Sequence, residues 1–402
     1  MSLLLKNGRI ITESGVLKGG YLLIEGQRIV SIGKDSRYPR ADEVIDLNGS
    51  VASPGFIDIH THGIADIDFM GNSAEDLHRS FEKYLQFGIT GLLPTTVSIT
   101  FDTIIEQVKL IRRVRDENPN GAMMQGVHVE GPWLSWRCRG GHPEEFLLVP
   151  VKEDVERLIG EVGDIVKTVT FSPELENALW LCETLSVHGI IPVIGHTEAT
   201  YEQTMDVIRA GARHVTHLFD ADIGFRESET EALTMEPGME TAALINDEVS
   251  VELIGCPIHV PTPLFRLVNK IKPRDRKILV SDSLIGAGMP EGSIITFRDG
   301  RQAKVREGVL RMMCKDNPDL DGNLTGSAIT MNMAVKRLSE YIDAPLEEAS
   351  RWATINPAIL LGIEQETGSL RVGKRADIVV FDDDVRVEMT LFGGKPAYRN
   401  KR

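Results

Sequence analysis

Eight apolar runs of strand length alternate with segments of helical periodicity through the middle of the chain, and this alternation restricts the possible folds more than any other feature. The runs cover residues 56–62, 91–97, 123–130, 166–171, 191–196, 214–219, 249–255 and 277–282. Residues 101–115 and 201–209 show the helical spacing clearly. Eight strand–helix units predict an α/β fold, a TIM (β/α)8 barrel over residues 53–363. An open, doubly wound parallel sheet is the alternative.

The two ends of the chain share a different pattern, in which short apolar strands are separated by glycine-containing turns. Within residues 1–52 the turns fall at positions 7–8, 19–20 and 25–26, and residues 376–381 form a further half-buried strand. Chain termini usually lie close together in a folded protein. We therefore expect residues 1–52 and 364–402 to build one small β-sandwich domain beside the barrel.

Polar side chains gather at the C-terminal ends of the predicted strands. The first run carries Asp58, His60 and His62 at alternate positions, so all three point to one face of the strand. The third, fifth, sixth and eighth runs end in further candidates, in order Glu130, His196, His217 and Asp282. Since the C-terminal strand ends form the active site of a TIM barrel, we expect these residues to meet in one site.

Two other histidines are expected to lie outside that set. His128 has the parity of Glu130 but sits one layer deeper, behind the site or in the core. His214 precedes His217 by three residues and therefore faces the opposite side of the strand.

This donor set predicts metal-assisted hydrolysis. Glu130, His196 and His217 would supply three protein ligands and leave one position for water, as in catalytic zinc sites. His60 and His62 would bind a second ion or orient the ligands of the first. Asp282 would take a proton from the water and return it to the leaving group. The ion is divalent, zinc with iron as the alternative, because both use these ligands.

Composition excludes some partners. The formal net charge of −15 disfavours nucleic acid and anionic membranes, which need a surplus of Lys and Arg. The four cysteines are scattered without a Cys-x-x-Cys pair, and no apolar stretch is long enough for a signal peptide or a membrane span. We expect a cytoplasmic protein acting on a small molecule.

Several motifs resemble the amidohydrolase superfamily, and within it the N-acetylglucosamine-6-phosphate deacetylases. Residues 54–63 (PGFIDIHTHG) are similar to the superfamily's opening motif, and residues 126–133 (GVHVEGPW) are more specific to the deacetylase branch. Further matches are FSPE at 171–174, GHTEAT at 195–200, VTHLF at 215–219 and LTGS at 324–327. The resemblance implies a TIM barrel with a β-sandwich, hydrolysis of an acetamide, one or two metal ions and a homodimer.

The resemblance also implies roles for single residues. It places His142 near the acyl carbonyl of the substrate and His259 at the sugar-phosphate end. The family's Asn-Ala-Met corresponds here to three other candidates for substrate contact, Asp220, Ala221 and Asp222.

A second departure concerns the phosphate. The Arg of the family's Arg-Glu-Pro-Gly, which helps to hold the 6-phosphate, is Met235 here, and Arg226 is a candidate substitute. Met235 offers none of the donors that a phosphate binds, and Asp220 and Asp222 add negative charge. We therefore expect an altered substrate.

The leading interpretation is a metal-dependent deacetylase of N-acetylamino sugars. A hydrolase for another C–N bond, in an unphosphorylated N-acyl sugar, an N-acyl amino acid or a cyclic amide, would use the same site. A non-catalytic binding relative is the third possibility, disfavoured because a retired site has no need of buried charges.

Overall fold

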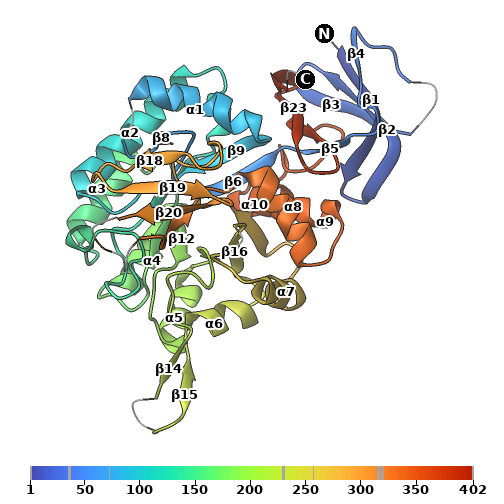
Figure 1. The fold of residues 1–402 in the computed structure, drawn as a ribbon. Coiled ribbons are helices and arrows are strands. Elements are labelled where there is room, and N and C mark those ends of the chain that lie inside the picture. Colours follow the sequence, from blue (N-terminus) through green and yellow to red (C-terminus); the bar gives the residue numbers. More distant parts are fainter. Residues whose placement is uncertain are drawn as a thin grey trace.

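The computed structural model describes residues 2–34, 38–71, 73–228, 231–256, 258–314, 317 and 321–400. Figure 1 shows a large body of strands wrapped by helices and a smaller β domain that carries both ends of the chain. All eight predicted central strands are present, with these bounds: β6 Phe56–Thr61, β9 Ile89–Pro94, β10 Val127–Glu130, β11 Val166–Phe171, β12 Ile191–Ile194, β13 His214–Val215, β16 Ser250–Ile254 and β17 Lys277–Val280.

Parallel pairing links these strands in chain order. Six of them form one sheet, β10-β11-β12-β13-β16-β17, and β6 pairs with β9. Single parallel bridges, Leu92 to Met124 and Thr95 to His128, join β9 to the segment of β10. A further bridge joins Thr61 at the end of β6 to Ser283 just after β17, so the last strand returns to the first. The C-terminal ends of all eight strands therefore face the same side of the fold.

Several strands are shorter than predicted, and the difference lies mainly at their ends. The predicted run 214–219 is paired only over His214–Val215, and the run 123–130 begins with a 3-10 turn at Gly121–Met123. At the C-terminal ends, the chain leaves the ladder so that polar side chains can turn toward the centre. His196 and Asp282 do so with φ of +50° and +44°, the left-handed region that is unfavourable for residues with a side chain.

Helices cover the outside of the strands, and the predicted helices at 101–115 and 201–209 are confirmed as α2 and α5. α2 buries Ile104, Ile105, Val108 and Ile111, which recur at helical spacing on one face. The ten α-helices among the described residues are α1 Ala74–Gln86, α2 Phe101–Glu117, α3 Lys152–Val162, α4 Ala178–Val187, α5 Tyr201–Ala210, α6 Met239–Ile245, α7 Thr262–Ile271, α8 Met331–Tyr341, α9 Leu346–Trp352 and α10 Ile355–Leu361. Glu144–Phe146 forms a second 3-10 turn.

Strands from both ends of the chain lie in one sheet. Its order is β24-β23-β22-β5-β1-β2-β3, and β4 pairs with β1 off this path. The expected sandwich is thus one continuous eight-stranded sheet, because β1 exchanges partners along its length, pairing with β4 and then with β5. The bounds are β1 Ser2–Thr12, β2 Gly15–Glu25, β3 Arg28–Gly33, β4 Glu43–Asp46, β5 Val51–Pro54, β22 Ile378–Phe381, β23 Val387–Phe392 and β24 Lys395–Arg399.

The sheet has a hydrophobic core of its own, which includes Leu5, Leu22, Ile378 and Leu391. It is joined to the larger body by aromatic packing, because Phe381 on β22 stacks on Phe56 of β6 with ring centroids 6.1 Å apart.

Three small β elements were not predicted. A four-stranded antiparallel sheet with its own small core follows β17, and a hairpin projects from the body beside α5 and α6 (Figure 1). Their bounds are β18 Ile294–Thr296, β19 Gln302–Arg306, β20 Val309–Met313 and β21 Leu324–Ser327 for the sheet, β14 Phe225–Glu227 and β15 Met235–Pro237 for the hairpin, and β7 Gly63–Ile64 with β8 Ile67–Asp68 beside the site.

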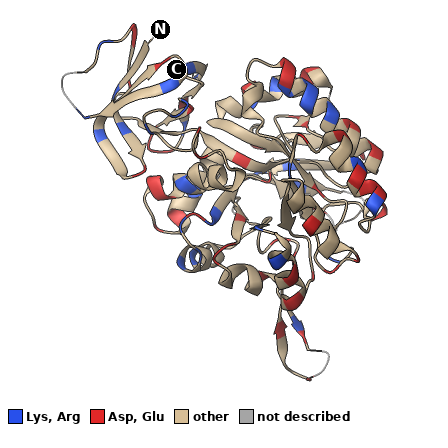
Figure 2. Cartoon of the chain, turned by 180° about the vertical axis from the view of Figure 1, so that it is seen from behind, with Lys and Arg blue, Asp and Glu red and all other residues tan. Residues whose placement is uncertain are grey.

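The surface carries both signs of charge. Figure 2 shows basic and acidic residues interspersed along the outer helices. Among the described residues, no helix combines the length and the apolar composition needed to cross a membrane.

Candidate metal centre and active site

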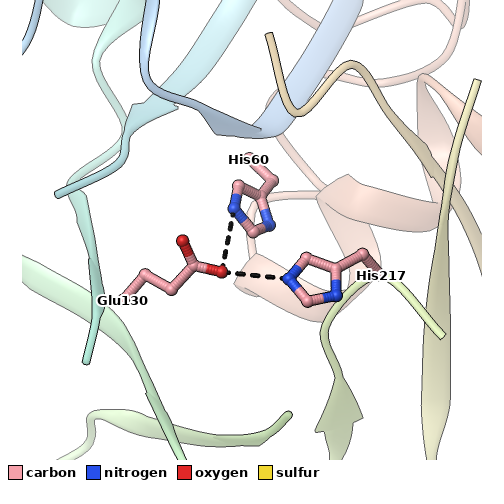
Figure 3. Close-up of side chains that lie close together, drawn as sticks. All are labelled: His60, Glu130 and His217. Atoms are coloured by element: carbon pink, nitrogen blue, oxygen red, sulfur yellow. Dashed lines mark hydrogen bonds and ion pairs between the residues drawn. The ribbon is translucent and has the colours of Figure 1, made fainter. Parts of the chain in front are cut away.

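Six predicted residues meet at the C-terminal ends of the central strands. His60 and His62 come from β6 and its end, Glu130 ends β10, and the other three follow β12, β13 and β17: His196, His217 and Asp282. Five of these side chains are buried, while Asp282 keeps 18% of its side chain exposed. Figure 3 shows how His60 and His217 point at the carboxylate of Glu130.

Glu130 lies at the centre of the site, and several histidines contact its carboxylate. Its Oε1 lies 3.1 Å from His217 Nε2, 3.2 Å from His196 Nε2 and 3.3 Å from His60 Nε2. Its Oε2 lies 3.3 Å from His62 Nε2 and 3.4 Å from His142 Nε2. Burial alone would raise the pKa of Glu130, but the electrostatic attraction of His60 and the contacts with His142, His196 and His217 hold it well below its usual range. Glu130 is thus an ionised carboxylate with both oxygens directed at ring nitrogens.

Hydrogen bonds at the far side of two rings fix which nitrogen carries the proton. His196 Nδ1 lies 2.8 Å from the carbonyl of Cys138, and His217 Nδ1 lies 3.2 Å from the carbonyl of Asp220. A carbonyl only accepts, so both Nδ1 atoms carry hydrogen and both neutral rings present a lone pair at Nε2. These two Nε2 atoms are 3.0 Å apart and both face Glu130. Two lone pairs and a carboxylate at this distance fit a bound cation.

His60 and His62 bring a second set of nitrogens to the same place. His60 Nε2 lies 3.4 Å and His62 Nε2 lies 3.2 Å from Asp282 Oδ1. His60 Nε2 is buried and makes no hydrogen bond, as expected of an atom that serves as a ligand. Of the three candidate ligand groups in the described residues, the first shares one residue with each of the others: His60, Glu130 and His217; His60, His62 and Asp282; and Glu130, His142 and His196.

Asp282 lies across the site from Glu130. Its backbone N–H donates to the carbonyl of His60, which holds the residue at the mouth of the site. Burial favours a higher pKa for Asp282, but His60 and a hydrogen bond from His62 lower it to about 2. The carboxylate is therefore ionised and able to accept a proton, and it is the most exposed of the six.

His142 presents the opposite tautomer. The backbone N–H of Ser98 donates to His142 Nδ1 at 3.0 Å, so that atom accepts and the neutral ring carries its hydrogen on Nε2. Burial lowers the pKa of His142 to about 4, which keeps the ring neutral. Its Nε2–H faces the centre and suits a hydrogen bond to an oxygen better than metal ligation. Ser98 was not predicted, although it lies just past the second predicted strand, and the C-terminal ends of the strands were expected to form the active site.

The residues predicted to contact substrate have varied surroundings. The carboxylate of Asp222 accepts from the backbone N–H of Thr197 at 3.2 Å. His259 Nδ1 lies 2.5 Å from Cys256 Sγ. Burial works to lower the pKa of His259, but the contact with Cys256 and the charge of Asp220 raise it above its ordinary value.

Ala221 and Arg226 were also predicted to contact the substrate. Ala221 lies near Gly140, where a Cβ would come within 3.5 Å of Ala221 Cβ and within 3.2 Å of the His196 ring. Arg226 lies on β14 in the projecting hairpin, opposite Glu236.

The structure bears out the expectation for His128 but not for His214. His128 Nε2 lies 2.7 Å from Thr170 Oγ1, and its ring packs against that of His60, one layer below the centre. His214 contacts the buried carboxylate of Glu252, whose other oxygen binds His60, so its ring lies on the inner side of the strand rather than on the opposite side. Parity does not relate His214 to His217 because the paired strand β13 ends at Val215. Glu252, on β16, was missed by sequence reasoning. Its position within an otherwise apolar strand is the same signal that singled out Glu130.

Comparison with known proteins gives consistent matches along the whole chain. The model of the amidohydrolase family matches residues 51–397. The N-acetylglucosamine-6-phosphate deacetylase of Bacillus subtilis (strain 168) is 30% identical over 404 residues, covering 100% of this chain and 98% of that protein. The N-acetylgalactosamine-6-phosphate deacetylase of Escherichia coli O157:H7 is 28% identical, covering 99% of this chain and 100% of that protein.

Solved structures agree. The N-acetylglucosamine-6-phosphate deacetylase of Pasteurella multocida superposes with a TM-score of 0.87 at 29% identity, covering 100% of both chains. A variant of the Mycobacterium smegmatis enzyme in complex with N-acetyl-D-glucosamine-6-phosphate gives a TM-score of 0.84 at 29% identity, covering 99% of both chains. With a family match over most of its length and a relative that is 30% identical along it, this chain belongs to the amidohydrolase family.

Proposed function

We propose that this protein is a metal-dependent hydrolase that removes the acetyl group from N-acetylamino sugars. One observation carries the proposal: the Nε2 lone pairs of His196 and His217, 3.0 Å apart, converge on the ionised Glu130, with Asp282 opposite. A cation site bounded by a carboxylate that can accept a proton is the arrangement that amide hydrolysis by an activated water requires. The relatives named as deacetylases of N-acetylamino sugar phosphates support the same reaction.

In this proposal Glu130, His196 and His217 hold a divalent ion, zinc or alternatively iron, and His60 and His62 extend the site toward a second. When bound, such an ion supplies Lewis acidity toward water and the amide carbonyl. Asp282 takes the proton of the attacking water and delivers it to the leaving amine. His142 donates from Nε2 to the acyl oxygen as negative charge develops there.

The proposal extends to the fold, the cellular location, the oligomeric state and the partner of the protein. The ring of eight strands is a TIM barrel over residues 53–363, and residues 1–52 with 364–402 form the accompanying β domain. The enzyme is cytoplasmic and a homodimer, with a small amino sugar rather than nucleic acid or membrane as its partner. The net charge of −15 and the mixed surface of Figure 2 support the choice of partner.

A second candidate substrate is an N-acetylamino sugar without phosphate. The observation that favours it is the placement of Asp220 beside His217 and His259, where its charge raises the pKa of both rings. Arg226, the candidate phosphate ligand, lies on β14 of the projecting hairpin, opposite Glu236. His259 then serves to orient the sugar rather than a dianion.

A substrate panel tests both versions. Release of acetate is followed with the metal-loaded protein on N-acetylglucosamine, its 6-phosphate and the corresponding galactosamine pair. N-acetyl amino acids, followed by the same release, and cyclic amides, followed by ring opening, are the alternative C–N substrates. Acetate from any of the sugars supports the proposed activity, and the ratio of rates with and without phosphate decides the substrate. Turnover confined to an amino acid or a cyclic amide would replace the proposal with the alternative hydrolase.

A further inference from the structure

Glu252 is a fully buried carboxylate directly behind the centre. It lies on β16, and 1% of its side chain is exposed. Its Oε1 accepts from His60 Nδ1 at 2.6 Å, from the hydroxyl of Thr216 at 2.5 Å and from the backbone N–H of His217 at 3.0 Å. No basic residue is needed to account for its burial, because three donors converge on one oxygen.

The second oxygen of Glu252 is held separately. His214 Nε2 lies 3.1 Å from Oε2, where a ring N–H donates, and His214 Nδ1 lies 2.9 Å from the hydroxyl of Ser250. Glu252 therefore has partners on both oxygens, from β6 and from β13 with the residues that follow it. A carboxylate fixed in this way sets the orientation of the groups that donate to it.

The contact with His60 has a direct consequence for the centre. A carboxylate accepts, so His60 Nδ1 carries hydrogen and its neutral ring presents the Nε2 lone pair on the other side. That Nε2 lies 3.3 Å from Glu130 and 3.4 Å from Asp282 and has no hydrogen bond. By the same geometry Glu252 holds the backbone of His217, the neighbouring candidate ligand.

We propose that Glu252 is a positioning residue of the metal centre, which fixes the tautomer and orientation of His60 and lends its negative charge to that imidazole. The inference rests on the proposed metal-dependent function. A negative partner on the far nitrogen makes an imidazole a stronger ligand, and loss of such a partner typically weakens metal binding by about 10- to 100-fold. Glu252 itself touches neither metal nor substrate.

The main variant is Glu252→Gln, which keeps the size of the side chain and an oxygen that accepts from His60 but removes the charge. Metal-free protein is titrated with Zn²⁺ against a competing chelator, and we expect the affinity at the centre to fall by about 10- to 100-fold. The matched control is Thr170→Val, which deletes a buried hydrogen bond to His128 on a neighbouring strand and is expected to leave the affinity unchanged.

A double-variant cycle tests whether Glu252 acts through His60. In a His60→Ala background, Glu252→Gln should cause a much smaller further loss of affinity, limited to its hold on the backbone of His217. An equal loss in both backgrounds, or an unchanged affinity in the single variant, overturns the proposal. Absence of Zn²⁺ binding by the wild-type protein would instead refute the proposed function.

Folding is checked in the metal-free state by thermal unfolding. If Glu252→Gln does not fold, Glu252→Asp keeps the charge but is one methylene too short to reach His60. We expect that variant to fold and to bind Zn²⁺ more weakly than the wild type. Affinity equal to that of the wild type in Glu252→Asp would show that the contact with His60 is dispensable.

Discussion

The Nε2 atoms of His196 and His217 lie 3.0 Å apart, and each ring carries its hydrogen on the far nitrogen. Two lone pairs in such proximity repel unless a cation lies between them and Glu130. We therefore expect removal of divalent ions by a chelator to lower the thermal unfolding temperature. Binding only to the folded state stabilises by about 2.7 kcal/mol at 100 times Kd. Re-addition of Zn²⁺ should restore the midpoint, and Mg²⁺ should not, since it prefers oxygen ligands.

Asp282→Asn should separate catalysis from metal binding. The amide keeps the shape of the side chain but cannot take a proton from water, so we expect turnover to fall by about 10²- to 10⁴-fold. Metal content, measured on the purified variant by elemental analysis, should stay close to that of the wild type, because Glu130, His196 and His217 remain. Unchanged turnover would contradict the assigned role.

His142→Ala should also lower turnover without loss of metal. Its Nε2–H is a donor because Ser98 occupies Nδ1, and removal of a donor to a developing oxyanion costs about 10²- to 10³-fold in kcat. His196→Ala is the comparison, since it removes a lone pair from the ion and should lower the metal content. Loss of metal from the His142 variant would identify that ring as a ligand instead.

Asp220→Asn should shift the preference between sugars. Asp220 acts on His217 and on His259, so removal of its charge favours a substrate that carries a phosphate dianion. Charges a few ångströms apart in a partly solvated site interact by roughly 1–4 kcal/mol, so we expect the phosphorylated sugar to gain about tenfold in kcat/KM relative to the unphosphorylated one. An unaltered ratio would show that this carboxylate does not face the substrate.

Phe381→Ala should destabilise the whole chain rather than the β domain alone. The ring stacks on Phe56, which lies on the same strand as His60, and both rings are fully buried. Deletion of a buried phenyl ring costs about 3–5 kcal/mol, which denaturant unfolding measures. Phe297→Ala, at a half-buried position just after β18, is the comparison and should cost less.

The positions of the site residues follow from the sequence because two simple rules act together. Strand parity places His60 and His62 on one face, and the rule that active sites lie at C-terminal strand ends brings Glu130 and Asp282 into one set. Parity failed for His214, because the paired strand β13 ends at Val215. The same rules did not reveal Glu252, since the sequence does not indicate which histidine a carboxylate in the middle of a strand will contact. The roles of these residues remain predictions.

Other parts of the fold lay beyond such rules. The exchange of partners along β1 depends on contacts between segments far apart in the chain, which periodicity does not report. The four-stranded sheet after β17 has strands of only three to five residues, so each gives too short a pattern to be recognised. Sequence reasoning chose Arg226 because it lies close to Met235 along the chain. It did not predict that the two residues lie on the paired strands of one hairpin, β14 and β15.

The pairing of β5 with β22 has a consequence for biosynthesis. Val51 pairs with Phe381 and Pro54 with Ile378, so one edge of β5 stays open on the ribosome until nearly the whole chain has been translated. Open strand edges recruit other strands, and here the edge lies one residue from β6, which carries His60. The β domain can therefore close only after β22 has been made, later in synthesis than every residue of the candidate metal centre.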